Sequence, residues 1–406
     1  MSRVLLLLPT TTYRTAAFLA AAHRLGVDVT VASEQPSTLE RLNPSALLTL
    51  DFQDPEGAAR RVLEFSQDWP LDAVVPVDSQ VVVAAATIAR VLGLRHNSTE
   101  SAAAAEDKHQ MRQLFLQAGV ASPPFTLCRL DEDRADLAAR VDYPCVVKPL
   151  SLAASQGVMR ADDPQQFVAR VDRLEAILAC QDGDVAGEFL VEQFVEGPEV
   201  ALEGILTDGA LRVLALFDKP DPLDGPFFEE TIYLTPSGLA DDLQESIAAS
   251  VQQAAGALGL TEGPVHAELR LAADGPVVLE VHGRSIGGLC SRLLKFGSGL
   301  SLEELIIRHA IDQEMELPDR QSQAAGVMMI PIPAAGRLEE VRGLEDARAI
   351  AGIDDVTITA HLGQQLVPLP EGSQYLGFLF ARADQPGAVE GALREAHRRL
   401  EFVIQS

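Results

Sequence analysis

The stretch VHAELRLAADGPVVLEVHGR, residues 265–284, decides how the rest of the sequence is interpreted. Two runs rich in apolar residues flank an Ala-Asp-Gly turn, a pattern typical of a β-hairpin. Glu268 lies before this turn and Glu280 lies after it at nearly the same distance, so the hairpin places their carboxylates almost opposite each other. Such carboxylates repel unless a cation bridges them, and Mg²⁺ favours carboxylate and phosphate oxygens. The hairpin therefore predicts a magnesium site, with two partly exposed structural glutamates as the alternative.

Two cations near apolar runs predict an anion-binding site. Arg284 follows the hairpin, where a guanidinium can hold a carboxylate or phosphate with two hydrogen bonds. Lys148 ends the run YPCVVKPL, and the residues after it are small enough for backbone N–H groups to approach phosphate. The alternatives are a surface salt bridge for Arg284 and an ordinary surface lysine and loop at Lys148. The loop candidates are Ser151, Ser155 and Gly157.

The segment EQFVEGPEVALEG, residues 192–204, is a candidate adenine slot. The backbone of Phe194 and Val195 can offer hydrogen bonds there, and Glu199 can reach a ribose. An acidic hairpin edge is the alternative interpretation of this segment.

Further from the hairpin, the pattern changes twice along the chain. Residues 1–97 alternate apolar strands with helices, which predicts a parallel sheet covered on both faces. A helical stretch over 97–119, with Glu100 at its third position, leads into a mainly antiparallel α+β region that ends with a capping box at Ser301–Glu304. From about residue 320 the pattern is a small α/β unit with a final amphipathic helix over 388–404. The predicted fold class is therefore α/β and α+β.

Composition excludes several classes of protein. The chain has 406 residues, and its 59 acidic and 32 basic residues give a net charge of -27, which repels nucleic acid and anionic membranes. No apolar run approaches the roughly 20 residues that span a bilayer, and the first apolar segment is too short for a signal peptide. The four cysteines are far apart, which disfavours a disulfide framework or zinc site and predicts a reducing, cytoplasmic location.

The order of these motifs resembles the ATP-grasp superfamily, and within it the L-amino-acid ligase and carboxylate–amine ligase branch, which is similar to biotin carboxylase. The resemblance rests on EDK at Lys108, CVVKPL at Lys148, VEQFVEGPE and the two-glutamate hairpin. It implies an N-terminal Rossmann-like domain, an ATP-grasp domain with a small nucleotide-lid subdomain and a larger metal and substrate subdomain, and a C-terminal α/β domain. The implied bounds are 1–97, 98–315 (98–187 and 188–315) and 316–406.

The resemblance also implies roles for individual residues. Lys108 and Lys148 contact ATP beneath a flap made by residues 151–157, and Lys219 adds a γ-phosphate contact. Arg284 binds the substrate carboxylate or steadies an acyl phosphate. The adenosine pocket is formed by Glu192, Phe194, Val195 and Glu199, and Mg²⁺, with Mn²⁺ as an alternative, is held by Glu268 and Glu280. The candidate substrate-binding residues are Ser79 with the neighbouring Asp78, Glu229, Glu230, His266, His282, Gly287 and Gly288.

Two departures from the family pattern stand out. His282 occupies the place where many members carry a metal-binding Asn, and an imidazole is a poor Mg²⁺ ligand beside carboxylates. The predicted flap contains only Gly157 where many relatives have several glycines.

The expected function is an ATP-dependent carboxylate–amine ligase that joins small molecules, such as amino acids, through an acyl phosphate and releases ADP and phosphate. The alternatives are a carboxylase that phosphorylates bicarbonate and a nucleotide-binding regulator without turnover. The expected partners are a small carboxylate and a small amine, with neither nucleic acid nor membrane, and the family resemblance allows for a homodimer.

Overall fold

The chain begins with a four-stranded parallel sheet in the order β3-β2-β1-β4. The computed structural model, which describes residues 2–180, 187–313 and 322–405, gives these strands as β1 (Arg3–Leu7), β2 (Asp28–Ser33), β3 (Leu47–Thr49) and β4 (Ala73–Pro76). Alternate β1 side chains enter two cores, one shared with α1 (Thr15–Leu25) and the other with α2 (Pro55–Asp68) and α3 (Val82–Leu92). The sheet is therefore covered on both faces, as its continuous apolar strands predict.

A four-stranded antiparallel sheet forms what we call the small subdomain. Its order is β5-β8-β6-β7, and its strands are β5 (Phe125–Arg129), β6 (Cys145–Pro149), β7 (Met159–Ala161) and β8 (Glu188–Gln193). Helices α6 (Arg134–Arg140) and α7 (Pro164–Leu178) contribute to its core. Because β8 lies between β5 and β6, the division between the two predicted subdomains is better placed after residue 193 than at 187/188.

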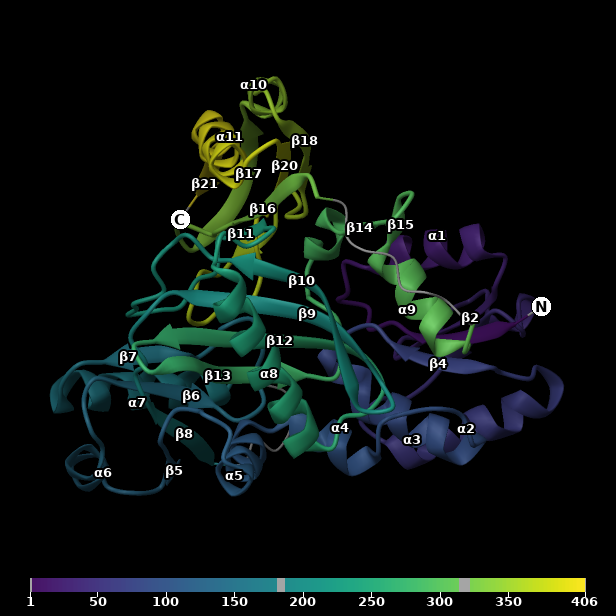
Figure 1. Cartoon of the computed structure of the whole chain (residues 1–406), viewed down its shortest axis with the longest axis horizontal. Coiled ribbons are helices and arrows are strands. Elements are labelled where there is room, and N and C mark those ends of the chain that lie inside the picture. Colours follow the sequence, from purple (N-terminus) through teal and green to yellow (C-terminus); the bar gives the residue numbers. More distant parts are fainter. Residues whose placement is uncertain (1, 181–186, 314–321, 406) are drawn as a thin grey trace.

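An eight-stranded antiparallel sheet forms the centre of the molecule (Figure 1), in the order β13-β12-β9-β10-β11-β16-β20-β18. Five strands come from the middle of the chain: β9 (Glu199–Thr207), β10 (Ala210–Asp218), β11 (Ile232–Thr235), β12 (Gly263–Ala272) and β13 (Gly275–His282). The other three are β16 (Ala324–Ile330), β18 (Ile353–Ile358) and β20 (Gly377–Ala383). The C-terminal strands thus extend the central sheet, and α8 (Asp241–Leu258) and α11 (Pro386–Arg399) pack on it.

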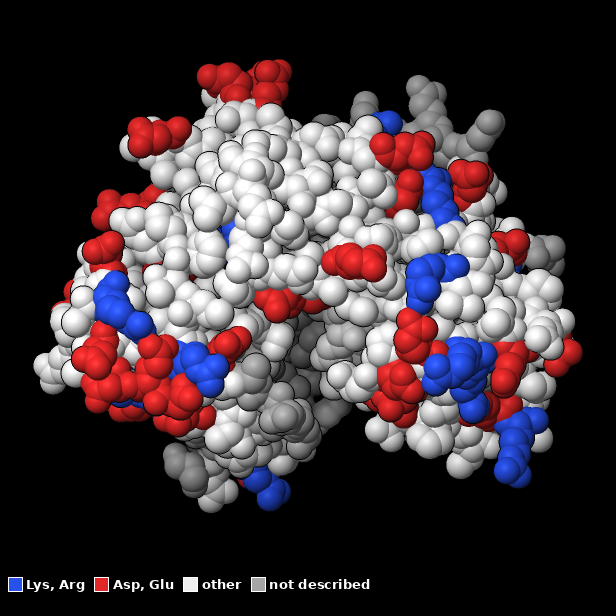
Figure 2. All heavy atoms as spheres, turned by 90° about the horizontal axis from the view of Figure 1, so that it is seen from below, with Lys and Arg blue, Asp and Glu red and all other residues white. Residues whose placement is uncertain are grey.

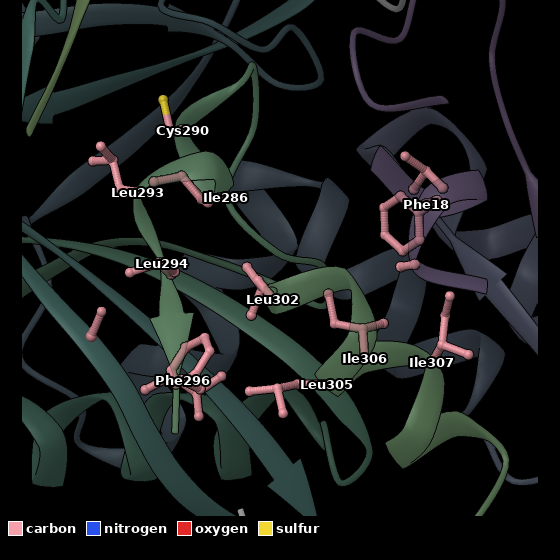
Figure 3. Packing of buried hydrophobic residues seen from close by; sticks show 14 of the residues in the cluster. Phe18, Ile286, Cys290, Leu293, Leu294, Phe296, Leu302, Leu305, Ile306 and Ile307 are labelled. Atoms are coloured by element: carbon pink, nitrogen blue, oxygen red, sulfur yellow. The ribbon is translucent and has the colours of Figure 1, made fainter. Parts of the chain in front are cut away.

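Helix α9 (Leu302–Ala310) joins the central sheet to the N-terminal domain. It starts with the predicted capping box, in which the side chains of Ser301 and Glu304 each accept from the other residue's backbone N–H. Figure 3 shows Leu302, Leu305, Ile306 and Ile307 of α9 between Phe18 of α1 and the residues 286–296. This packing fixes the domain that carries β4 against the two-glutamate hairpin.

The remaining elements are short or lie at the C-terminal end. The strands β17 (Gly336–Arg342), β19 (Gln365–Leu366) and β21 (Glu401–Gln405) form a separate sheet in the order β19-β17-β21, and β14 (Lys295–Phe296) pairs with β15 (Leu300–Ser301). The other helices are α4 (Thr99–Glu106), α5 (Lys108–Ala118), α10 (Leu344–Arg348) and the 3-10 turns η1 (Glu40–Leu42), η2 (Ser79–Val81) and η3 (Cys290–Leu293).

Two helix predictions need correction. The stretch 97–119 is two helices, because the Asp107 side chain accepts from the Gln110 backbone N–H and starts α5 anew. Ser98 caps α4, which makes Glu100 its second residue and not its third. The final helix ends at Arg399, and Glu401–Gln405 is a strand because β17 offers it a hydrogen-bonding partner.

Surface charge agrees with the composition. On the face in Figure 2, the Lys and Arg side chains of the described residues lie beside Asp and Glu and form no continuous basic patch. Among the described helices, none combines the length and the apolar composition that a membrane crossing requires.

The partly buried imidazole of His309, on α9, should make the free energy of unfolding depend on pH. Its Nε2 lies 3.0 Å from Oγ1 of Thr207, and burial lowers its pKa to about 4. A histidine in the unfolded chain titrates near pH ~6.5, so the unfolded chain binds a proton that folded His309 excludes. The contribution to the free energy of unfolding is complete above pH ~6.5 and is lost as the pH falls towards 4.

The His309→Gln variant should therefore lose less stability than the wild type between pH 7 and pH 5. Urea unfolding at the two pH values measures this difference, and His361→Gln, at an exposed position, is the matched control. An equal loss in the wild type and His309→Gln would contradict the assignment.

Candidate active site

The two glutamates of the hairpin are direct cross-strand partners. Glu268 of β12 pairs with Glu280 of β13, and His266 pairs with His282 one step along the same face. The register shifts by one residue directly after Glu268. The structure thus brings together the carboxylates that the turn position predicts to be opposite, and it adds an imidazole beside each.

The Glu268 carboxylate belongs to a cluster around the buried ammonium of Lys219. Lys219 Nζ lies 2.7 Å from Glu199 Oε1 and 3.5 Å from Glu268 Oε1, and it also contacts Glu230. Burial opposes the charge of Lys219, but the three glutamates together hold its pKa well above the usual value. Burial and the neighbouring Glu268 raise the pKa of Glu230. One ammonium group therefore contacts three carboxylates, which come from β9, β12 and the loop before β11.

The Glu280 carboxylate faces a different pair of side chains. Its Oε1 lies 3.5 Å from Lys108 Nζ, and its Oε2 lies 3.0 Å from His282 Nε2. The other ring nitrogen of His282 lies 3.5 Å from Glu106. Burial raises the pKa of Glu280, yet Lys108 and His282 outweigh burial and hold it well below its usual range. Glu280 is therefore an anion in this structure.

Glu192 lies between two cations in a buried triad. Its carboxylate is 2.7 Å from Arg112 Nε and 2.6 Å from Lys148 Nζ. Burial raises the pKa of Glu192, but the two cations outweigh burial and lower it. The predicted phosphate lysine and a predicted adenosine residue are thus neighbours. Arg112 was missed in the sequence, where its only signal is a charge between the apolar Met111 and Phe115.

Arg270 is a second cation that the sequence analysis missed. It is the register partner of Glu199 across β9 and β12, and its Nε lies 3.3 Å from Glu199 Oε2. It also donates a hydrogen bond of 3.0 Å to the carbonyl of Val195. The guanidinium carbons of Arg160 and Arg270 lie 4.1 and 5.0 Å from the centre of the Phe194 ring. Arg270 therefore fixes the backbone of the predicted adenine slot.

Arg284 connects the hairpin to the N-terminal domain. Its Nε donates to Ser79 Oγ at 2.9 Å, directly after β4, and its guanidinium also donates to the carbonyl of Ser285 at 3.0 Å. Arg14 donates to Ser285 Oγ at 2.7 Å and pairs with Glu303 at 3.2 Å. The carboxyl end of a parallel strand thus meets the end of the hairpin, as ligand sites in α/β folds require.

His266 lies beneath the carboxylate of Glu268. It is buried, with Nδ1 at 3.2 Å from Glu203 and Nε2 at 3.4 Å from Glu268. The fully buried Glu203 also accepts the backbone N–H of Ile286 at 2.9 Å. The structure thus places His266 behind Glu268, and Glu203 was missed because it lies in an otherwise apolar strand.

The other predicted residues lie on loops outside the strands and helices. Ser155 and Gly157 have φ values of 56° and 74°, and Ser151 is exposed. Glu229 is half-buried, and burial raises its pKa. At Gly288, with φ at 58°, a Cβ would lie 3.1 Å from the ring of Phe378, whereas one at Gly287 would meet nothing within 4 Å.

Comparisons with known proteins cover most of the chain. Family models match as an ATP-grasp N-terminal domain at residues 19–96, an ATP-grasp domain at 141–292 and an L-amino acid ligase C-terminal domain at 328–405. Each matched range lies within one predicted domain.

Individual proteins show the same similarity. An L-amino acid ligase from Bacillus licheniformis has a TM-score of 0.85 and 27% identity, covering 100% of this chain and 99% of that one. The alanine–anticapsin ligase of Bacillus subtilis is 26% identical, covering 66% of this chain and 60% of that protein. An uncharacterized protein of Sinorhizobium fredii is 25% identical, covering 100% of this chain and 84% of that protein. The chain thus spans less than two thirds of the length of the alanine–anticapsin ligase.

Proposed function

Because the chain belongs to the ATP-grasp superfamily of ligases, we propose that it is an ATP-dependent carboxylate–amine ligase. It joins two small molecules by an amide or peptide bond through an acyl phosphate, with release of ADP and phosphate. The observation that carries this proposal is the cross-strand pair of Glu268 and Glu280, with Lys219 beside one and Lys108 beside the other.

The donor set fits Mg²⁺, which the superfamily uses with ATP. Two carboxylates on one face of a hairpin offer the hard oxygen ligands that Mg²⁺ takes together with phosphate oxygens. When bound, the ion would neutralise charge on the phosphate groups, and Mn²⁺ is a chemically similar alternative. His282 touches both Glu280 and Glu106. We therefore assign it the role of orienting Glu280, in place of the metal ligation by the Asn of many relatives.

The buried cations of the site allow a strongly acidic chain to bind two anionic reactants. A substrate carboxylate and the γ-phosphoryl group repel each other, so the site must neutralise both. Lys108, Lys148 and Lys219 are buried and paired with glutamates, which keeps them in place before a nucleotide arrives. Arg284, positioned by Ser79, is assigned to the substrate carboxylate or the acyl phosphate.

The nucleotide and amine subsites follow from the same geometry. We assign adenosine to Glu192, Phe194, Val195 and Glu199, beneath the flap of residues 151–157. The half-buried carboxylate of Glu229, with Glu230, is assigned to the ammonium group of an amino-acid substrate. The relatives named as amino-acid ligases support this substrate class. We also propose that the protein works in a reducing compartment, because all four cysteines are free. A homodimer is proposed from the family resemblance.

The deciding experiment is phosphate release from ATP and Mg²⁺ over a panel of amino acids and small carboxylates. We expect turnover only when a carboxylate and an amine are both present, with a condensed product detected by mass spectrometry. Turnover with bicarbonate alone would instead identify the carboxylase alternative. ATP binding without turnover on any pair would favour a regulator and contradict the proposal.

A further inference from the structure

The flap of residues 151–157 contacts the C-terminal part of the chain. The backbone N–H of Gly157 donates to the carbonyl of Pro370 at 2.9 Å, and the Gln156 side chain donates to the carbonyl of Glu371 at 2.7 Å. Arg173 of α7 forms a two-pronged pair with Glu371, with N–O distances of 2.6 and 2.9 Å. Three contacts thus connect the small subdomain to one loop, residues 367–372.

The other end of the flap contacts the candidate phosphate site. The backbone N–H of Lys108 donates to the carbonyl of Leu150, at 3.1 Å, and Lys108 Nζ donates to the carbonyl of Leu152, at 2.9 Å. The same Nζ lies 3.5 Å from Glu280. The flap therefore spans from a lysine at the metal carboxylates to the loop 367–372.

The loop 367–372 contains a tight turn and leads into the central sheet. It connects β19 to β20, a strand in the middle of the C-terminal half of the central sheet. Gly372 donates to the carbonyl of Pro368 at 2.9 Å, and a Cβ at Gly372 would lie 1.9 Å from the carbonyl oxygen of Val367, so the turn requires glycine. Pro370 is buried. The loop therefore has a defined turn conformation where it contacts the flap.

A second contact orients the small subdomain but does not touch the flap. Arg160 of β7 donates through its backbone N–H to Pro226, at 2.9 Å, and Met159 bridges to Phe227. Both contacts lie on the segment that precedes Glu229. Residues 226 and 227 thus hold β7, while the flap itself is held by Lys108 at its start and by the loop 367–372 at its end.

We propose that the loop 367–372 is a latch for the nucleotide flap, in which Glu371 and Arg173 are positioning residues that hold residues 151–157 over the phosphates and slow the release of ADP. This inference rests on the proposed nucleotide site. Hydrogen bonding from Arg173 lowers the pKa of Glu371, so the pair is charged at neutral pH. A partly exposed ion pair of this kind changes a local equilibrium by about two- to fivefold.

The test compares Glu371→Arg, which makes the pair repulsive, with the double variant Arg173→Glu/Glu371→Arg, which restores opposite charges. Glu371→Gln is the milder second variant if the charge reversal impairs folding. The control is Glu175→Gln, which changes a residue of the same helix as Arg173 and removes its pair with Arg134 of α6 without touching the loop. Two quantities are measured: hydrogen exchange of the peptide that contains Gly157, without nucleotide, and the dissociation rate of MgADP.

We expect Glu371→Arg to raise both rates by about two- to fivefold, the double variant to return both close to the wild-type values, and the control to change neither. Unchanged rates in Glu371→Arg and Glu371→Gln, or no recovery in the double variant, would overturn the latch. A wild-type chain that binds no MgADP would refute the proposed function, while the exchange measurement would still decide whether the loop holds the flap.

Discussion

Replacing Glu280 with alanine is expected to lower ADP formation by at least about a hundredfold, while the chain still binds ATP. Glu280 supplies half of the cross-strand carboxylate pair and is held as an anion by Lys108 and His282. Without it, a bound divalent ion would have one ligand fewer and Lys108 would lose its carboxylate partner, so charge on the γ-phosphoryl group would be poorly neutralised. The predicted adenosine residues Phe194 and Val195 lie after β8 and keep their contacts with Arg270.

The matched control for this variant is Asp274→Asn, which changes an exposed carboxylate in the turn of the same hairpin. It should turn over at the wild-type rate. Nucleotide affinity is measured by calorimetry with ATP and Mg²⁺, and turnover by ADP release. Normal turnover in Glu280→Ala would remove the metal-bridging role of this residue.

The second large effect is expected from Lys219→Met. The carboxylates of Glu199, Glu230 and Glu268 have ligand atoms within 4.8 Å of one another, and Lys219 is the ammonium that lies among them. Removing one partner from a buried ionic cluster costs about 3–5 kcal/mol. We therefore expect the free energy of unfolding at pH 7 to fall by that amount, together with a loss of turnover.

The repulsion left in Lys219→Met also predicts the pH dependence of that variant. Carboxylates that repel in the folded state have raised pKa values, so their protonation stabilises the variant, and its deficit should shrink as the pH falls towards 4. Adding Glu230→Gln to Lys219→Met should recover part of the stability. Lys295→Met, at a half-buried lysine outside the cluster, is the control. Urea unfolding that matches the wild type in Lys219→Met would contradict this account of the cluster.

Local sequence patterns were sufficient to predict contacts between residues that are close in the sequence, such as two strands joined by one turn. The position of Ala-Asp-Gly between two apolar runs predicts that Glu268 and Glu280 face each other, and the strands pair in this register. The capping box at Ser301 and the covered parallel sheet at the N-terminus are likewise confirmed. In each case the interacting groups are close in the sequence or repeat with the period of a strand or helix.

The partners of the site residues could not be predicted in this way. Arg270 faces Glu199 because β12 pairs with β9, a register that neither strand specifies alone. Arg112 reaches Glu192 only when α5 packs beside β8, and Arg14 lies 271 residues from Ser285 in the chain. Tertiary packing also overrode local propensity at Glu401–Gln405, where pairing with β17 ends the predicted helix. Such long-range pairs can be identified only once the three-dimensional fold is known.

The most direct test of the account is a crystal structure of the chain with Mg²⁺ and a non-hydrolysable ATP analogue. We expect one ion, held by the carboxylates of Glu268 and Glu280 against the phosphate groups. The adenine should lie beside Phe194 and Val195, and the phosphates near Lys148. A nucleotide bound elsewhere, or an ion that neither glutamate touches, would contradict it.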